Sequence, residues 1–261
     1  MIPLRDNIPS VRTPVVNYAL LALCALAFVG QLVDQGDGRA DWIERYGMVP
    51  ARVLDPGQPI VAEQLVRQGP GLPPVVQRFQ LGEPGFHPWL TFLTSIFLHG
   101  GFMHFLGNML FLYIFGDNVE DRLGHVGYLI FYLLAGLGAS MGHLVFNAGS
   151  PIPTIGASGA IAGVMGAYFV LYPRARIVTL VPIFIVLQMM TLPAVVFLGL
   201  WFLMQFTGVL GAQAGVAWWA HIGGFVIGAA VGWFLRQRPG PRPPSSPRIV
   251  AVPSDRWERP S

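Results

Sequence analysis

The chain has 261 residues, of which 53% are apolar and only 11% are charged, and its mean hydropathy is +0.55. This composition excludes an ordinary soluble domain and is typical of a protein that crosses a membrane several times. All sixteen basic residues are arginines in predicted loops and tail, so we interpret the net charge of +3 as a topology signal rather than a nucleic-acid surface. The single cysteine, Cys24, excludes a disulfide framework.

Six apolar segments follow a short polar leader, residues 1–14. The first is not a cleavable signal peptide, because five more follow it. The apolar stretch 177–209 is too long for one crossing and contains Pro182 and Pro193, so we divide it into an interfacial or re-entrant piece, 177–190, and a fifth span. The predicted spans are 15–33, 89–115, 126–146, 157–171, 192–210 and 216–235.

Two further segments lie outside the predicted helix bundle. Residues 34–88 form a long loop rich in proline and glycine, in which the amphipathic piece 41–50 favours a small element at the membrane interface. Residues 237–261 form a tail rich in proline, serine and arginine, a composition that predicts disorder. Residues 15–236 are then one membrane domain.

The distribution of arginine predicts the orientation of the spans. The leader, the 116–125 and 172–176 turns and the C-terminal segment from Arg236 onward contain eleven arginines, whereas the 147–154 and 211–215 turns contain none. Because short arginine-rich loops stay in the cytoplasm, we expect both termini to be cytoplasmic and the 34–88 loop to be external.

Ser158 is the first polar side chain that suggests a reactive site. It lies in the small-residue run 154–166, where Gly159 and Gly163 are four positions apart, and close helix packing alone would explain such a run. His221 lies in a second apolar segment with glycines at 224, 228 and 232. A serine nucleophile and a histidine base are the parts of an acyl-transfer site.

Depth in the membrane links these residues to a third span. Counted from the cytoplasmic ends at about 1.5 Å per residue, Ser158, His221 and His104 lie at about 21, 22 and 20 Å. That level is roughly 10 Å below the outer surface of an apolar core about 30 Å thick, so a water-filled recess is needed above it. Asn108 shares the helix face of His104, and His99, about 27 Å up, is expected near the rim. Singly, each could instead hydrogen-bond a neighbouring helix.

Several enzyme classes are excluded by what the sequence lacks. No Asp or Glu occurs between Arg122 and Asp255, so spans three to six supply no carboxylate for a triad or an aspartyl protease, and the serine and histidine would act as a dyad. There is no His-Glu-x-x-His motif, and His99 and His104 would point in different directions on a helix, so no metal is expected. The absence of a glycine-rich nucleotide loop gives no reason to expect a cofactor.

At these residues the chain resembles the rhomboid intramembrane serine proteases. The resemblance covers about residues 89–236, and the motifs occur in family order on the expected spans. They are His99 with His104-x-x-x-Asn108, Glu120-x-Arg122, Gly156-Ala-Ser158-Gly159, and Ala220-His221-x-x-Gly224-x-x-x-Gly228. The resemblance implies an all-α polytopic membrane protein with a rhomboid-like six-transmembrane-helix bundle, located in a bacterial plasma membrane.

The resemblance also implies a role for each matching residue. Ser158 would be the nucleophile and His221 the general base, while His104, Asn108 and the Ser158 backbone N–H would form the oxyanion hole. The structural positions would be Glu120, Arg122, Gly156, Gly159, Gly224 and Gly228.

The expected function is that of an intramembrane serine endopeptidase, without metal or cofactor, that cuts single-span membrane proteins near the outer face of the bilayer. The alternative is an inactive rhomboid-like protein that binds membrane clients, but such relatives lack the serine or the histidine. A transporter or channel would distribute polar residues through the membrane depth, whereas the cytoplasmic halves of spans four and six are nearly all apolar. Span five, with Trp201, Phe202 and Phe206, is the expected lateral gate for a client helix.

Overall fold

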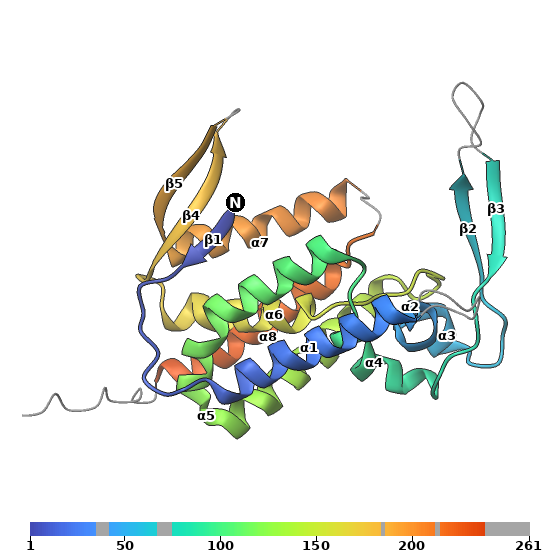
Figure 1. Ribbon diagram of the computed structural model, residues 1–261, viewed down its shortest axis with the longest axis horizontal. Coiled ribbons are helices and arrows are strands. Elements are labelled where there is room, and N and C mark those ends of the chain that lie inside the picture. Colours follow the sequence, from blue (N-terminus) through green and yellow to red (C-terminus); the bar gives the residue numbers. More distant parts are fainter. Residues whose placement is uncertain (35–41, 67–74, 184–185, 212–214, 238–261) are drawn as a thin grey trace, which may run out of the picture.

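The protein is mostly helical in the computed structural model, which describes residues 1–34, 42–66, 75–183, 186–211 and 215–237. The main helices lie side by side in one bundle (Figure 1). Within the described ranges three of them, α1, α5 and α8, are long and apolar enough to cross a membrane, and the apolar α6 and α7 are shorter. Their bounds are α1 (Val15–Val33), α5 (Phe102–Phe146), α6 (Ser158–Leu171), α7 (Ala194–Leu210) and α8 (Trp218–Arg236).

Helix α5 contains the second and third predicted spans joined end to end. Its 45 residues are interrupted at Gly124, whose φ of 71° and ψ of 165° lie outside the helical region. Glycine suits this position because residues with a side chain rarely adopt a positive φ. The chain therefore changes direction at Gly124, within the predicted 116–125 turn, and the residues on both sides of it are helical.

The second span begins later than the predicted residue 89. The chain first forms three short helical turns, and α5 starts only after Gly100 and Gly101. Gly101 has φ of 149°, a conformation that glycine adopts readily, and α5 begins at the next residue. The predicted helix 89–115 is therefore wrong in its first part, which contains η1 (Pro88–Leu90), α4 (Thr91–Thr94) and η2 (Ser95–Phe97).

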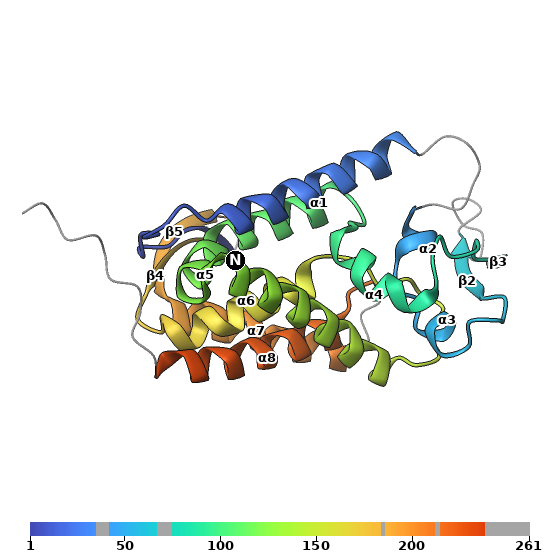
Figure 2. The same cartoon turned by 90° about the horizontal axis from the view of Figure 1, so that it is seen from below.

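Helix α6 lies in the middle of the bundle, with α8 along one side (Figure 2). The two helices touch through backbone rather than side chains. A Cβ atom added to Gly224 or Gly228 of α8 would lie 2.1 Å or 1.8 Å from the carbonyl oxygen of Gly159 or Gly163. The glycine spacing on α8 thus permits the close helix approach expected from the sequence.

The glycines of α6 also bring this helix close to α5. A Cβ atom on Gly159 would lie 2.7 Å from the Cβ atom of Ala139, and one on Gly163 would lie 2.7 Å from that of Ala135. Both alanines belong to α5. Small residues therefore bring α6 close to α5 on one side and to α8 on the other, which fixes the start of α6 relative to both.

A three-stranded antiparallel sheet lies at one end of the bundle (Figure 1). Strand β1 (Ile2–Arg5), in the predicted leader, pairs with β4 (Arg176–Ile183), which pairs with β5 (Val186–Pro193). The piece 177–190, predicted only as interfacial or re-entrant, is thus a hairpin. Its β-branched residues favour a strand, and Ile177 and Thr179 alternate as buried positions.

The described parts of the loop 34–88 lie at the opposite end of the bundle from this sheet (Figure 1). They are α2 (Trp42–Tyr46), α3 (Pro50–Leu54) and a hairpin of β2 (Val61–Val66) with β3 (Val75–Gln80). The amphipathic piece predicted at 41–50 contains only the five-residue α2 and the start of α3. Met48 pairs with Thr154 through two backbone hydrogen bonds of 3.1 and 2.7 Å, which join the loop to the segment that enters α6. The predicted disordered tail, from residue 238 onward, lies outside the described residues.

The predicted structural residues Glu120 and Arg122 join α5 to the two outer helices. Glu120, which is buried, accepts hydrogen bonds from the backbone N–H groups of Val16 and Asn17 at 3.0 and 2.7 Å. Arg122 donates to the carbonyl oxygen of Leu235 at 2.5 Å. The carboxylate therefore satisfies two N–H groups in the first turn of α1, and the guanidinium binds the last turn of α8.

Candidate active site

Ser158 and His221 meet where α6 and α8 begin. Ser158 is the first residue of α6, and His221 lies in the first turn of α8. The distance between Ser158 Oγ and His221 Nε2 is 2.8 Å, within hydrogen-bonding range. A serine hydroxyl in contact with an imidazole nitrogen is the arrangement in which the histidine can remove the hydroxyl proton.

The turn before Ser158 lies close to two side-chain donors, His104 and Asn108. His104 Nδ1 accepts a hydrogen bond from the Gly100 N–H at 3.3 Å, so the ring proton of a neutral His104 is on Nε2. A Cβ atom added to Gly156 would lie 2.8 Å from this Nε2 and 3.6 Å from Asn108 Nδ2. Both donors therefore lie next to Gly156, two residues before Ser158.

Asn108 is notable because its amide nitrogen is buried yet has no hydrogen-bond partner among the described residues. An unpaired buried donor costs about 1–3 kcal/mol, and such groups in native proteins call for an explanation. A negatively charged oxygen formed beside Ser158 would give this donor a partner.

Gly156 permits the close approach of His104. Its φ is 119°, which residues other than glycine rarely adopt. A Cβ atom at this position would contact the His104 ring at 2.8 Å. The Gly156 N–H donates to the carbonyl oxygen of Ser95 at 2.9 Å, which fixes the turn against η2. Both the backbone conformation and the space therefore require glycine here.

His99 does not lie at the rim of the site, as its expected height suggested. Its side chain is only 1% exposed and packs between Phe28 and Phe105, with ring centroids 6.3 and 5.3 Å away. Gln31 of α1 holds its backbone N–H and carbonyl through two hydrogen bonds of 3.0 Å. Because α5 starts only at Phe102, His99 lies in the segment before the helix and not on it. The centroids of the His99 and His104 rings are 5.4 Å apart.

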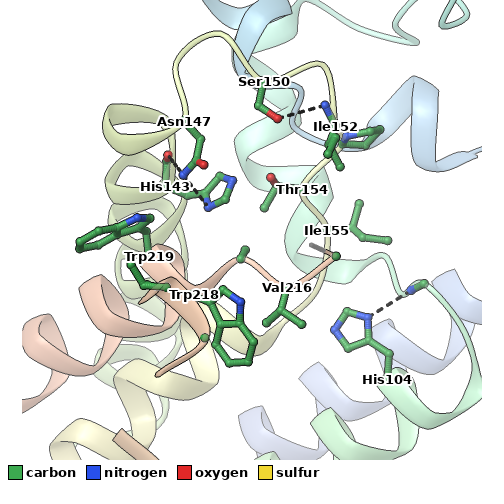
Figure 3. A pocket seen from close by; sticks show the side chains of 16 residues that line it. His104, His143, Asn147, Ser150, Ile152, Thr154, Ile155, Val216, Trp218 and Trp219 are labelled. Atoms are coloured by element: carbon green, nitrogen blue, oxygen red, sulfur yellow. Dashed lines mark hydrogen bonds between the residues drawn. The ribbon is translucent and has the colours of Figure 1, made fainter. Parts of the chain in front are cut away.

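A cavity of about 530 Å³ opens beside the dyad, with His104 in its wall (Figure 3). Ser158 lines an adjoining recess of about 10 Å³, which shares Thr154, Ile155 and Ala217 with the cavity. That recess has room for roughly one water molecule. The residues shared with this recess place the cavity near Ser158, which is half-buried.

Three polar residues at the site were not among the predicted site residues. His143 of α5 and Asn147, the residue that follows this helix, line the cavity (Figure 3). They lie four positions apart, the same spacing as His104 and Asn108, so their repetition was a usable signal. Gln205 of α7 contacts His221 Nδ1 through Oε1 at 2.8 Å. A single glutamine in an apolar span carries no spacing signal.

Comparison with known proteins gives matches to rhomboid proteins. The chain is 44% identical to the Rhomboid protease GluP of Bacillus subtilis (strain 168) over 79 residues, which are 30% of this chain and 15% of that protein. It is 32% identical to RHOMBOID-like protein 4 of Arabidopsis thaliana over 56% of this chain and 34% of that protein. It is 27% identical to the mitochondrial Rhomboid protein 1 of Saccharomyces cerevisiae (strain ATCC 204508 / S288c), over 56% of this chain and 42% of that protein.

The matched region coincides with the helices that carry the candidate site. This chain spans less than half the length of the three curated relatives. The family model described as the Rhomboid domain matches residues 87–238, more than half of the 261-residue chain, and includes α5, α6, α7 and α8. The chain therefore belongs to the rhomboid family, whose domain implies an integral membrane protein with several membrane-spanning helices.

Proposed function

We propose that this protein is an intramembrane serine endopeptidase that uses Ser158 and His221 as a catalytic dyad. The observation that supports this most directly is the 2.8 Å contact between Ser158 Oγ and His221 Nε2. The two donors beside Gly156 and the adjoining cavity supply the other parts of an acyl-transfer site.

In the proposed reaction, Ser158 Oγ attacks the scissile carbonyl carbon while its proton passes to His221 Nε2. The carbonyl oxygen becomes negatively charged and accepts hydrogen bonds from His104 Nε2, Asn108 Nδ2 and the Ser158 N–H. That N–H is in the first turn of α6, where helical N–H groups have no intrahelical acceptor. His221 then protonates the leaving amine, and a water molecule from the cavity hydrolyses the ester by the same steps.

We further propose six membrane crossings, with both termini cytoplasmic. The two halves of α5 supply two crossings, and the other main helices supply one each. Helix α6, with 14 residues, is about 21 Å long and so starts inside an apolar core about 30 Å thick. Reporters fused after residue 175 or 245 should be cytoplasmic and one inserted near residue 212 external. An external tail would contradict this orientation.

The proposed substrates are single-span membrane proteins, and α7 is the proposed route for their lateral entry. Trp201 and Phe202 of α7 stack on Phe225 of α8 at 6.2 and 4.4 Å, so this contact is made by bulky rings. Contacts between side chains separate more easily than the backbone contact between α6 and α8.

The dyad is tested by incubating the purified protein with a model single-span substrate. Ser158→Ala and His221→Ala should each abolish cleavage, and the double variant should be no worse than either, because nucleophile and base act as a unit. Ser10→Ala, at the exposed N-terminal segment, is the serine control and should cleave like the wild type.

Substantial cleavage by either purified dyad variant would refute the proposed mechanism. Wild-type protein that binds the substrate without cutting it would instead indicate a client-binding protein.

A further inference from the structure

We propose that Gln205 is a positioning residue that fixes the ring orientation and proton position of His221, taking the place that a carboxylate has in a catalytic triad. The inference rests on the proposed Ser158–His221 dyad. It concerns a residue on α7, the helix that packs on the far side of His221 from Ser158, and the observations that support it are separate from those that identify the dyad.

The position of Gln205 is well defined by its surroundings. The residue is only 4% exposed, although its helix has many exposed apolar side chains. Its Oε1 lies 2.8 Å from His221 Nδ1, and its Nε2 donates to the carbonyl oxygen of Trp201, one turn earlier, at 2.6 Å. Because a carbonyl oxygen can only accept, the amide nitrogen must face Trp201 and the amide oxygen must face His221.

This fixed amide determines which nitrogen of His221 carries the proton. An amide oxygen can only accept a hydrogen bond, so it favours a proton on Nδ1. A neutral imidazole has only one N–H, which leaves Nε2 unprotonated and 2.8 Å from Ser158 Oγ. This is the tautomer that can accept the serine proton, and Nδ1–H remains bonded to Gln205 when the ring becomes positively charged.

The opposite tautomer is disfavoured at the same two contacts. With the proton on Nε2, the amide oxygen of Gln205 would face a nitrogen lone pair, and Ser158 would lose its acceptor. Aromatic rings on two helices also restrict the imidazole, since the Trp201 and Trp218 ring centroids lie 5.8 and 6.1 Å from it. Gln205 adds the polar contact that selects one orientation of the His221 ring between these aromatic side chains.

The test compares two substitutions of Gln205 that differ in the acceptor but not greatly in size. Gln205→Met keeps the length and removes the strong acceptor, while Gln205→Glu keeps an acceptor for Nδ1. Thr207→Val on the same helix is the control, because Thr207 is exposed and donates only to the carbonyl oxygen of Met204. For each variant, kcat and KM on a model single-span substrate and the rate of Ser158 labelling by a fluorophosphonate are measured.

We expect Gln205→Met to lower kcat and the labelling rate by about 10- to 100-fold, the range seen when the partners that orient metal-bound histidines are removed. Its KM should stay within about twofold of the wild-type value, because Gln205 is not among the residues that line the cavity. A residue that orients the base affects the chemical step rather than substrate binding. Gln205→Glu should restore most of kcat, and Thr207→Val should match the wild type. Unchanged thermal unfolding of Gln205→Met would show that the helix packing is intact.

Wild-type kcat and labelling in Gln205→Met would overturn the inference. Equal losses in Gln205→Met and Gln205→Glu would also overturn it, because an acceptor retained for His221 Nδ1 would then make no difference. In both cases an inactive Ser158→Ala would show that the dyad itself stands. Full cleavage by Ser158→Ala would mean that the proposed function has failed, and the role of Gln205 with it.

Discussion

At the scale of single residues, the site is defined by which nitrogen atoms are left without a partner. His104 uses Nδ1 to accept from Gly100, and Asn108 keeps a buried amide nitrogen with no partner in the described part of the chain. Donors held in place before the substrate arrives need no reorganisation when negative charge develops. In the proposed mechanism, the buried Asn108 donor gains a hydrogen-bond partner only in the transition state.

His104→Ala and Asn108→Ala should therefore each lower kcat by about 10²- to 10³-fold, the usual effect of removing one oxyanion donor, with little change in KM. Steady-state kinetics on a model substrate would measure this. Asn7→Ala is the matched control, because Asn7 lines neither the cavity nor the recess and its side chain accepts from the Arg176 N–H at 2.6 Å. A change confined to KM would identify His104 and Asn108 as substrate contacts instead.

At the scale of elements, the distance between Ser158 and His221 depends on backbone contact between α6 and α8. Gly228→Ala would place a methyl group 1.8 Å from the carbonyl oxygen of Gly163, so the helices must separate. Overpacking of this kind costs about 1–3 kcal/mol, and we expect a lower unfolding temperature together with slower labelling of Ser158. Gly107→Ala in α5 is the control, because no atom lies within 4 Å of its added methyl group. Equal stability of the two variants would show that the close helix contact is unimportant.

The elements also show how far sequence reasoning reaches. The pairing of Ser158 with His221 could be predicted because four-residue glycine spacing and helix depth are local properties. The hairpin at 176–193 could not, because a short apolar run fits a strand and a buried helix equally well. The predicted position of His99 at the rim is wrong because it assumes one continuous helix, whereas Gly100 and Gly101 lie between η2 and α5. Gln205 was missed because its partner is defined only by the packing of α7 on α8.

At the scale of the whole molecule, the depth of the site predicts where the proposed protease would cut and which substrates it would accept. A helical peptide bond is shielded by its own hydrogen bonds, so a substrate segment must become extended to reach Ser158. We expect faster cleavage when a poly-Leu helix is weakened by Gly-Pro near its outer end, with a small residue such as Ala, Gly or Ser before the cut. Gel analysis and mass spectrometry of the products would measure both. Equal cleavage of the stable helix, or cutting near its cytoplasmic end, would contradict this expectation.

The N-terminal strand makes the fold depend on the order of synthesis. Strand β1 ends at Arg5, but its partner β4 begins at Arg176, about 170 residues later in the chain. At about 5–20 residues per second, a ribosome needs roughly ten to thirty seconds to make the chain between them. During this time the first strand has no sheet to join, whereas Val11 and Arg12 can already bind Asp121 once α5 has formed. The sheet therefore forms late, because β1 can pair with β4 only after the helices that carry Ser158, His104 and Asn108 have been made.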